Sequence, residues 1–501
     1  MLDAQLYLEA LLSRGRDRGR IDMSSEKKQV PGKRRERPLG WRKLGWGMVP
    51  LLLLVARMAN AATISDIQRM LVATPTVVPD DWTTYMAGIE RSGFNKNETT
   101  INPATAPQLQ LYWSVKAAAT IFSQPIVANG MIYWGSWDGF EHATDLSGKQ
   151  VWKDDLGTSR TACTNDVGVL NTATVAPVVI EGTSTSVVFI GGGNGHLYAL
   201  DAATGATIWS TALGSSPDNF LWSSPILYNG SVYEGVSSIG DCPLIQGKLV
   251  QLDAATGKIT HTFDTVPNGC VGASIWGSPT IDAADDSIYF ATGNGGPCSR
   301  NEPYAEALVK LRTANLSFLD AWSVPQSARM SDGDFGSTPT LFEATIGGMV
   351  RHMVGLVNKN GYYYAFDRTA IGHGPVWQRV IGGQNTIAPS AWDGTHLYVG
   401  GQEVTINGKK CAGSVKALNP ATGGPVWEHC LGNGAVTGAV TLAPGIVVVS
   451  EGLSVLVLAT ANGRTLFRYT SRTEHFLGPA SIANGVLYIG SEKGTLYAFG
   501  L

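Results

Sequence analysis

Short stretches of apolar and polar residues alternate along most of the chain. Residues 195–200 (Gly-His-Leu-Tyr-Ala-Leu) and 494–499 (Gly-Thr-Leu-Tyr-Ala-Phe) have the two-residue period of a strand that buries one face. An amphipathic helical pattern of the kind that an α/β enzyme needs does not accompany them. The pattern therefore predicts many short strands.

These strands belong to a repeated unit. The clearest copy, residues 199–209, reads Ala-Leu-Asp-Ala-Ala-Thr-Gly-Ala-Thr-Ile-Trp. Its Asp and Thr can bond neighbouring backbone N–H groups, its Gly can take the positive φ of a hairpin, and its Trp can cover the next unit. Imperfect copies recur about every 51 residues on average, and the eight aromatic positions are Trp113, Trp152, Trp209, His261, Trp322, Trp377, Trp427 and Phe467.

Eight four-stranded units at this period predict an all-β, eight-bladed β-propeller. The chain ends at residues 497–501 on an inner pair of strands without an outer Trp strand, while the first unit, residues 101–113, has the reverse deficit. Pairing of the first strand with the last blade would close the ring and remove both free edges. A β-sandwich lacks a repeat of this length.

Composition agrees with this fold. Among 501 residues there are 60 Gly and 14 Trp, and only 15% are charged. Tight turns account for the Gly excess, and six of the Trp residues are docking positions of the repeat. The 44% hydrophobic content excludes a disordered chain, and the scarcity of charge excludes a coiled coil.

The N-terminal region has the pattern of an export signal. Basic residues at 33–43 precede an apolar run at 45–56 and a small-residue site at 59–61. The run is shorter than the roughly 20 residues that a membrane span requires, although an uncleaved anchor remains the alternative. We therefore expect a signal segment at 1–61, a lead-in at 62–100 and a propeller at 101–501, in a periplasmic or secreted protein with no stable membrane span after processing.

Two details of export stay open. Met23 is a second possible start, because residues 1–22 add nothing to a signal. Arg34 and Arg35 suggest the twin-arginine route, but Glu-Arg-Pro follows them where such signals have apolar residues. Removal of residues 1–61 leaves 24 Lys and Arg against 34 Asp and Glu, a net charge of −10. An acidic body of this kind argues against a nucleic-acid partner.

The repeat A-x-D-x-x-T-G-x-x-x-W resembles the tryptophan-docking motif of the quinoprotein alcohol dehydrogenases, eight-bladed propellers whose cofactor is pyrroloquinoline quinone. The resemblance covers about residues 80–501. It is strongest toward the polyvinyl-alcohol-dehydrogenase-like branch, through residues 275–282 (Ile-Trp-Gly-Ser-Pro-Thr-Ile-Asp) and 334–339 (Asp-Phe-Gly-Ser-Thr-Pro). Non-catalytic scaffolds of outer-membrane assembly share the repeat, so the site residues must be considered separately.

Two matches concern the residue under the cofactor and the catalytic base. The resemblance places Trp276 under the planar quinone and makes Asn294, 18 residues later, a ligand of Ca²⁺. It makes Asp334 both the catalytic base and a metal ligand. Gly336 stands where lanthanide-dependent relatives carry an extra carboxylate, which favours calcium. A packing Trp and solvated turns are the alternative interpretation.

Three further residues have weaker matches. Lys359, in Asn-Lys-Asn-Gly, corresponds to the basic residue that contacts the quinone oxygens, although a lysine beside a hairpin turn is often merely solvated. Asp241 stands where the family has a longer Glu ligand of Ca²⁺. Arg160 is a guess for a second basic contact to the quinone. Up-and-down connectivity puts the loops of Asp241, Trp276, Asn294 and Asp334 on one face of the ring.

The six cysteines are 163, 242, 270, 298, 411 and 430, and export makes disulfides plausible. None adjoin, unlike the vicinal pair of methanol- and ethanol-oxidising relatives. Cys411 and Cys430 flank one outer hairpin and could pair, and Cys242 and Cys270 stand in a similar relation. Cys163 and Cys298 are left without an assigned partner, with buried free thiols as the alternative.

The sequence thus favours an exported quinoprotein dehydrogenase that uses pyrroloquinoline quinone and Ca²⁺ to oxidise a small or polymeric alcohol. Because there is no Cys-x-x-Cys-His haem motif, electrons would pass to a separate acceptor such as a cytochrome c. The alternatives are a non-catalytic propeller that binds envelope proteins and, less favoured, a sugar-oxidising quinoprotein.

Overall fold

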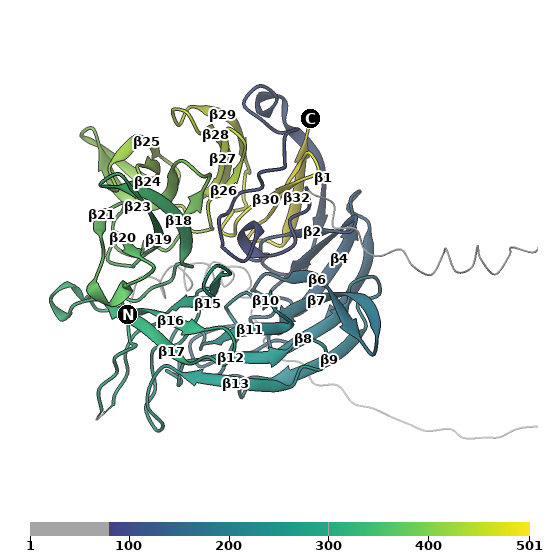
Figure 1. The fold of residues 1–501 in the computed structure, drawn as a ribbon. Coiled ribbons are helices and arrows are strands. Elements are labelled where there is room, and N and C mark those ends of the chain that lie inside the picture. The colour runs from purple at the N-terminus through teal and green to yellow at the C-terminus, as the bar shows by residue number, and fades with distance from the viewer. Residues whose placement is uncertain (1–79, 299) are drawn as a thin grey trace, which may run out of the picture. The chain divides into compact units, whose positions relative to one another are not determined.

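The computed structural model describes residues 80–298 and 300–501, which form eight antiparallel sheets of four strands each. Figure 1 shows these sheets as blades around a ring. The predicted all-β, eight-bladed propeller is therefore confirmed. The expected signal segment at 1–61, and the lead-in as far as residue 79, lie outside the described residues.

We number the blades from the first complete sheet. Blades 1 and 2 consist of β2 (Ile126–Ala128), β3 (Met131–Gly135), β4 (Phe140–Asp145), β5 (Gln150–Asp155), β6 (Thr174–Ile180), β7 (Thr183–Gly191), β8 (His196–Asp201) and β9 (Thr207–Ala212). Blades 3 and 4 consist of β10 (Ile226–Tyr228), β11 (Ser231–Val236), β12 (Lys248–Asp253), β13 (Ile259–Asp264), β14 (Thr280–Asp282), β15 (Ser287–Ala291), β16 (Ala307–Arg312) and β17 (Phe318–Ser323).

Blades 5 and 6 consist of β18 (Thr340–Ile346), β19 (Met349–Val357), β20 (Tyr362–Asp367), β21 (Trp377–Val380), β22 (Ala391–Trp392), β23 (Leu397–Ile406), β24 (Lys409–Leu418) and β25 (Pro425–Leu431). Blades 7 and 8 consist of β26 (Thr441–Ala443), β27 (Ile446–Glu451), β28 (Ser454–Ala459), β29 (Thr465–Thr470), β30 (Ser481–Ala483), β31 (Val486–Gly490), β32 (Thr495–Gly500) and β1 (Gln110–Lys116).

Helical structure in the described residues is limited to single turns. These are η1 (Tyr85–Ala87), η2 (Ala106–Gln108), η3 (Gln326–Ala328) and η4 (Ile371–His373). Within residues 80–298 and 300–501, no helix is long and apolar enough to span a membrane.

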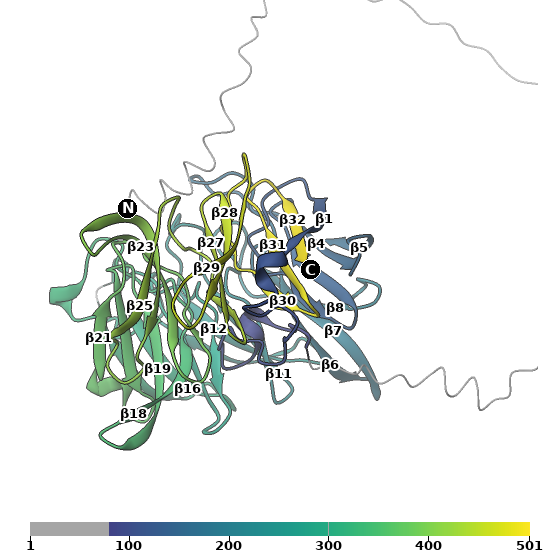
Figure 2. The ribbon, with the colours of Figure 1, turned by 90° about the horizontal axis from the view of Figure 1, so that it is seen from above.

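The ring closes as predicted, through the first strand. β1 pairs antiparallel with β32, from Lys116 opposite Thr495 to Gln110 opposite Gly500. Figures 1 and 2 both show these two strands side by side near the C-terminus. The closing blade thereby obtains the outer strand that its own sequence lacks.

The docking role of the tryptophans is also confirmed. Trp152 donates its indole N–H to the Ala202 carbonyl of the next blade at 3.0 Å and lies against Gly205. A Cβ on Gly205, whose φ is +76°, would come within 2.7 Å of the indole, so this turn requires glycine. Trp113, Trp209, Trp377 and Trp427 make the same indole bond to a carbonyl of the following blade.

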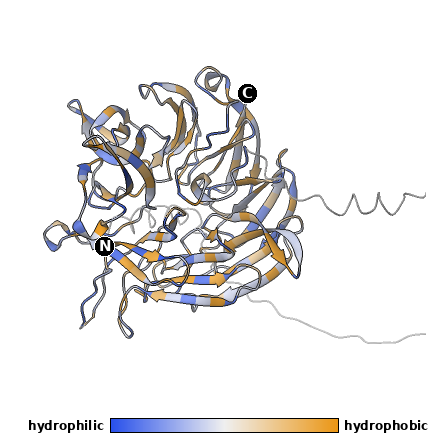
Figure 3. Cartoon of the chain, viewed as in Figure 1, coloured by the Kyte–Doolittle hydropathy of each residue, from blue (hydrophilic) through white to orange (hydrophobic). Residues whose placement is uncertain are grey.

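Burial follows strand position within each blade. All six residues of β28 are buried, whereas β9 mixes exposed and half-buried residues. Figure 3 shows hydrophobic stretches in every blade. The middle strands are covered by a neighbouring blade on each side and can be apolar throughout, while an outer strand keeps the alternating pattern of a half-solvated edge.

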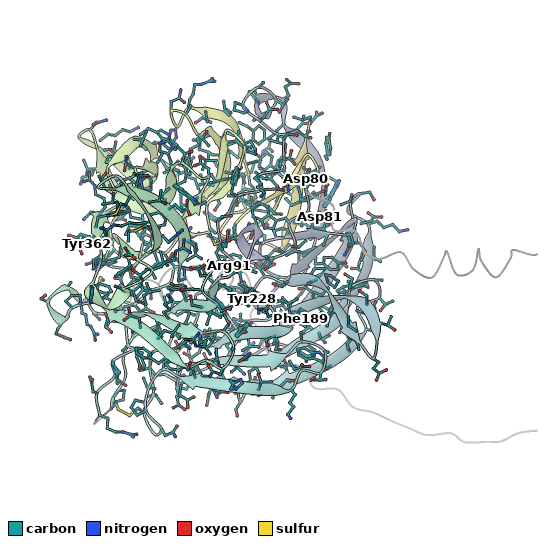
Figure 4. All side chains as sticks on the ribbon, viewed as in Figure 1. Asp80, Asp81, Arg91, Phe189, Tyr228 and Tyr362 are labelled. Carbon is teal, nitrogen blue, oxygen red and sulfur yellow. A yellow bond between two sulfur atoms is a disulfide. The ribbon has the colours of Figure 1, made fainter. Side chains whose placement is uncertain are left out.

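A lead-in segment, residues 82–95, hydrogen-bonds to the inner edge of the ring. Its backbone or side chains bond the innermost strand, or the residue just before it, in every blade; the ring partners are Val127, Val175, Pro225, Pro279, Ile281, Leu341, Trp392, Leu442 and Ile482. Arg91, labelled near the middle of the ring in Figure 4, is fully buried. The segment therefore satisfies backbone groups that the innermost strands would otherwise leave unpaired.

The disulfides correct one of the two expected pairings. Cys411 pairs with Cys430 as predicted. Cys242, however, pairs with Cys163 rather than Cys270, and Cys270 pairs with Cys298, so the pairing of Cys242 with Cys270 was wrong. The reason is that these four cysteines lie in loops and not in a hairpin, and loops distant in sequence meet at the same face of the ring.

Candidate active site

All six candidate residues come from loops on one face of the propeller, with Arg160 in the loop between β5 and β6. Asp241, Asn294 and Lys359 lie between the second and third strands of blades 3, 4 and 5. Trp276 and Asp334 lie just before the first strands of blades 4 and 5. Both kinds of loop emerge on the same face of an up-and-down sheet, so the fold itself collects these residues.

Lys359 is the centre of their contacts. Its ammonium lies 2.6 Å from Asp334 Oδ1 and 2.7 Å from Asp332 Oδ1. Lys359 and Asp334 are only 7% and 3% exposed, so a true ion pair replaces the solvated lysine that a hairpin turn can carry. Its backbone is fixed as well, because the Lys359 N–H donates to the Asp334 carbonyl at 3.1 Å.

Trp276 joins the network through its ring nitrogen. The indole N–H donates to Asp334 Oδ2 at 2.8 Å, and the Lys359 ammonium lies 5.0 Å from the centroid of the ring. Gly336 packs against the far edge of the indole, where a Cβ would approach Cη2 to 2.0 Å. With the indole in this place, position 336 accommodates glycine and no larger residue.

Asn294 links two more carboxylates. Its amide nitrogen donates to Asp241 Oδ2 at 3.1 Å and to Asp332 Oδ1 at 2.9 Å. Asp241, Asp332 and Asp334 therefore surround one amide and one ammonium. The site thus brings three carboxyl groups and one cationic side chain together.

These charges shift the pKa values in different directions. Burial raises the pKa of Asp334 above its ordinary value, with Lys359 opposing and Asp332 reinforcing the shift. Burial acts in the same sense on Asp332, but the nearby Lys359 and the hydrogen bonds from Lys359 and Asn294 outweigh it and lower its pKa. Burial alone would lower the pKa of Lys359, yet its two carboxylate partners raise it, so Lys359 stays charged.

Arg160 does not join this network in the described structure. It pairs with Asp166 at 2.6 Å, and both side chains are more than half exposed. Ser159 and Val167 bridge the base of this loop, which holds Arg160 and Asp166 together at the surface. The Cys163–Cys242 disulfide ties the same loop to the turn of Asp241.

Asp332 and the lead-in were not assigned site roles from sequence. The Asp-Gly-Asp spacing of 332–334 is a visible signal for a second carboxylate, but its bond to Lys359 is not. Inside the channel, a cavity of about 80 Å³ is lined by Trp276, Trp222, Gly336 and, from the lead-in, Tyr85. Burial raises the pKa of Tyr85 to about 12, so it stays a neutral hydroxyl. A cavity of this volume has room for a few water molecules, so a tricyclic ligand on Trp276 would require the surrounding side chains to move.

The side chains fit a flat anionic ligand beside a hard cation. A flat group stacked on the indole face of Trp276 that bears Lys359 would meet the ammonium, and the oxygens of Asp241, Asp332 and Asp334 suit Ca²⁺ in donor type and charge. Among residues 80–298 and 300–501, no three His, Cys, Asp or Glu side chains are grouped closely enough to hold a metal as they stand. The amide oxygen of Asn294, after a rotation of the side chain, would be needed to complete a ligand set.

The sequence is similar to a family model and to several known proteins. A family model described as "Outer membrane protein assembly factor BamB" (PQQ_2) matches residues 141–405 and 412–500. The chain is 25% identical over 483 residues to a polyvinylalcohol dehydrogenase from Pseudomonas sp., covering 82% of this chain and 73% of that protein. It is 24% identical over 348 residues to the quinohemoprotein alcohol dehydrogenase of Comamonas testosteroni, covering 62% of this chain but only 48% of the relative.

Solved structures agree on the fold. The crystal structure of quinohemoprotein alcohol dehydrogenase from Comamonas testosteroni superposes with a TM-score of 0.67 at 18% identity, over 88% of this chain and 82% of the other. BamB from Moraxella catarrhalis gives a TM-score of 0.51 at 17% identity, over 78% and 98%. At these identities the likeness extends to the propeller architecture alone.

Proposed function

The chain belongs to the PQQ_2 family, and on that premise we propose that it is a quinoprotein dehydrogenase that oxidises an alcohol. The observation that carries the proposal is the buried network of Asp334, Lys359 and Trp276. Burial of charged groups costs free energy unless they are paired. A surface that only binds other proteins has no need for three carboxylates around one lysine in a channel mouth.

In this proposal Trp276 supports pyrroloquinoline quinone, and Lys359 contacts its oxygens. Asp241, Asn294 and Asp334 would hold Ca²⁺, with Asp332 as a further oxygen donor that the structure brings to the same place. When bound, the quinone supplies a two-electron acceptor that takes hydride from the alcohol carbon. Arg160 would contact the quinone only if its side chain left Asp166.

Asp334 takes the alcohol proton. Its Oδ2 is held by the Trp276 N–H at 2.8 Å, which orients the carboxylate. The raised pKa of Asp334 makes it a stronger base than an ordinary Asp, and Lys359 opposes the rise by favouring the charged carboxylate. The base strength of Asp334 thus comes from its burial and from Asp332, whereas its orientation comes from Trp276.

The proposed substrate is an alcohol, because the two relatives are a polyvinylalcohol dehydrogenase and a quinohemoprotein alcohol dehydrogenase. Export to the periplasm or beyond, and transfer of electrons to a separate carrier such as a cytochrome c, complete the proposal. The acidic body and the signal-like N-terminus support export.

Reconstitution tests the proposal directly. Protein incubated with pyrroloquinoline quinone and millimolar Ca²⁺, then desalted, should retain the absorbance of the quinone at about one equivalent per chain. It should reduce a dye in the presence of alcohols, and Asp334→Asn should abolish this reduction. Asp218→Asn, which changes an exposed carboxylate on the same face, should not.

A second function is favoured by one observation, the description of the matching family as an outer-membrane assembly factor. A propeller that binds envelope proteins would retain no quinone at millimolar Ca²⁺. That result would reject the dehydrogenase and favour the scaffold. A screen of sugars against simple alcohols would separate a sugar-oxidising enzyme from the proposed one.

A further inference from the structure

A second hollow lies between the end of β13 in blade 3 and the loop that precedes β16 in blade 4. This outer groove has a volume of about 470 Å³, and its walls include Asp264, Pro267, Asn268, Asn301, Pro303 and Tyr304. It is far larger than the cavity of about 80 Å³ within the channel. None of these residues has a role in the proposed chemistry.

The groove and the candidate site share the same two loops. One loop, between β13 and β14, carries Asn268 and then Trp276; the other, between β15 and β16, carries Asn294 and then Asn301. The groove residues lie on the parts of these loops nearest the outer strand β13 and the start of β16. The site residues lie at the opposite parts, toward the channel.

Covalent and backbone contacts hold the two loops together between groove and site. The Cys270–Cys298 disulfide joins them, and the Ala273 N–H donates to the Asn294 carbonyl at 2.6 Å. From the loop that carries Asp241, Gln246 donates its amide to the Val266 carbonyl at 2.9 Å. The loops that line the groove are therefore fixed to the loops that carry Trp276, Asn294 and Asp241.

The chemistry of the groove suits a chain that carries hydroxyl groups. Tyr304 offers an aromatic surface and packs against Phe263 and Phe318, whose ring centroids each lie 5.4 Å from its own. Aromatic faces pack against C–H groups. The exposed Asn301 amide can donate and accept hydrogen bonds, as a hydroxyl does, and the Asn268 amide, whose Oδ1 accepts from Gln246 at 3.3 Å, has its N–H groups to donate. The carboxylate of Asp264 accepts from hydroxyls and disfavours anionic ligands.

We propose that the outer groove is a binding subsite for a neutral polyhydroxylated chain, which it holds while one hydroxyl group of that chain reaches Asp334. This inference rests on the proposed function for the reaction at Asp334. The subsite itself makes a separate claim, because binding in the groove requires neither quinone nor turnover. The chain could be a vinyl-alcohol polymer or a neutral glucan, which share this chemistry.

Affinity electrophoresis of the full protein, through gels containing either polyvinyl alcohol or a neutral glucan, measures binding without turnover. At least one polymer should retard the protein, and the polymer that does so identifies the source of the chain. Tyr304→Ala should weaken the retarding interaction about tenfold, the loss typical of a central aromatic contact. Asn301→Ala changes an exposed side chain and should weaken it severalfold without a risk to folding.

Asn315→Ala is the matched control, since Asn315 is an exposed Asn in blade 4 but lies in the turn between β16 and β17, on the opposite face. It should bind polymer like the parent protein. In the reconstituted enzyme, Asn301→Ala should raise KM for the polymer and leave kcat, and KM for a monomeric secondary alcohol, unchanged.

Two results would overturn the subsite: retardation by neither polymer, or equal retardation of the parent protein, Tyr304→Ala and Asn301→Ala. A rise in KM for the monomeric alcohol as large as for the polymer would also contradict it. Groove-dependent polymer binding in a protein that takes up no quinone would leave the subsite standing and reject the dehydrogenase instead.

Discussion

Asp334 and Glu474 occupy equivalent loops of the ring, but their surroundings give the two carboxyl groups different properties. Asp334 precedes the first strand of blade 5, and Glu474 precedes the first strand of blade 8. Glu474 accepts hydrogen bonds from the hydroxyls of Ser491 and Tyr497 and lies 3.5 Å from Lys116 of β1. It therefore connects the two strands that close the ring.

The surroundings of Asp334 and Glu474 shift the pKa values of the two carboxyl groups in opposite directions. Burial raises the pKa of Asp334 and the neighbouring Asp332 adds to this, whereas the hydroxyl donors and Lys116 outweigh burial at Glu474 and lower its pKa. A carboxylate with a lowered pKa stabilises the fold in its charged form, and one with a raised pKa is charged at a cost in stability. We infer that Asp334 is maintained for chemistry and Glu474 for ring closure.

The largest expected effect follows from exchanging each carboxylate for its amide. Asp334→Asn should lower kcat of the reconstituted enzyme by about 10²- to 10⁴-fold, the usual contribution of a general base. Glu474→Gln should leave kcat within about twofold. Steady-state dye reduction by both variants measures this, and a similar loss in both would show that the comparison is wrong.

The free energy of unfolding should fall most when Lys359, the cation of the candidate site, is removed. Lys359→Met leaves Asp332 and Asp334 buried without their partner, which should lower the free energy of unfolding by about 3–5 kcal/mol. Addition of Asp334→Asn to this variant should recover part of the loss, because one buried charge is then removed. Denaturant unfolding of the metal-free proteins measures both, and an unchanged double mutant would contradict the assigned pairing.

The disulfides provide a third contrast, since two of the three hold loops around the candidate site. Cys163→Ala with Cys242→Ala should lower the free energy of unfolding by about 2–4 kcal/mol and weaken Ca²⁺ uptake, because Asp241 is next to Cys242. Cys411→Ala with Cys430→Ala, in the outer strands of blade 6, should lower stability with no effect on Ca²⁺. Equal Ca²⁺ affinity in both variants would contradict the proposal that Asp241 is a ligand of the metal.

The sequence predicts the blades and their closure well, but it predicts the contacts between the loops of different blades poorly. The docking repeat is local, since Asp201, Thr204 and Gly205 bond within one turn, and it therefore indicated the blade number and the closure through β1. The partners of Lys359 and of Cys242 are not local: they come from other loops that meet only once the ring exists. The lead-in around Arg91 carries no repeat at all, so its bonds to every blade had no signal in the sequence.

The smallest effect is the pH dependence of ring closure. Because the pKa of Glu474 in the folded protein lies below its ordinary unfolded value of about 4.3, its stabilisation is present above that value and is lost as the pH falls through the folded pKa. Glu474→Gln should therefore cost about 1 kcal/mol of unfolding free energy at neutral pH, reduced by solvent screening of the Lys116 pair.

Unfolding of the parent protein and Glu474→Gln in denaturant, between pH 7 and pH 3, measures this difference. The two stabilities should converge as the pH falls, since the protonated Glu474 and the Gln then resemble each other. Asp218→Asn, at an exposed carboxylate on the same face, should match the parent protein throughout. A gap between parent and Glu474→Gln that widens toward low pH would mean that Glu474 acts in its neutral form, and the contrast with Asp334 would disappear.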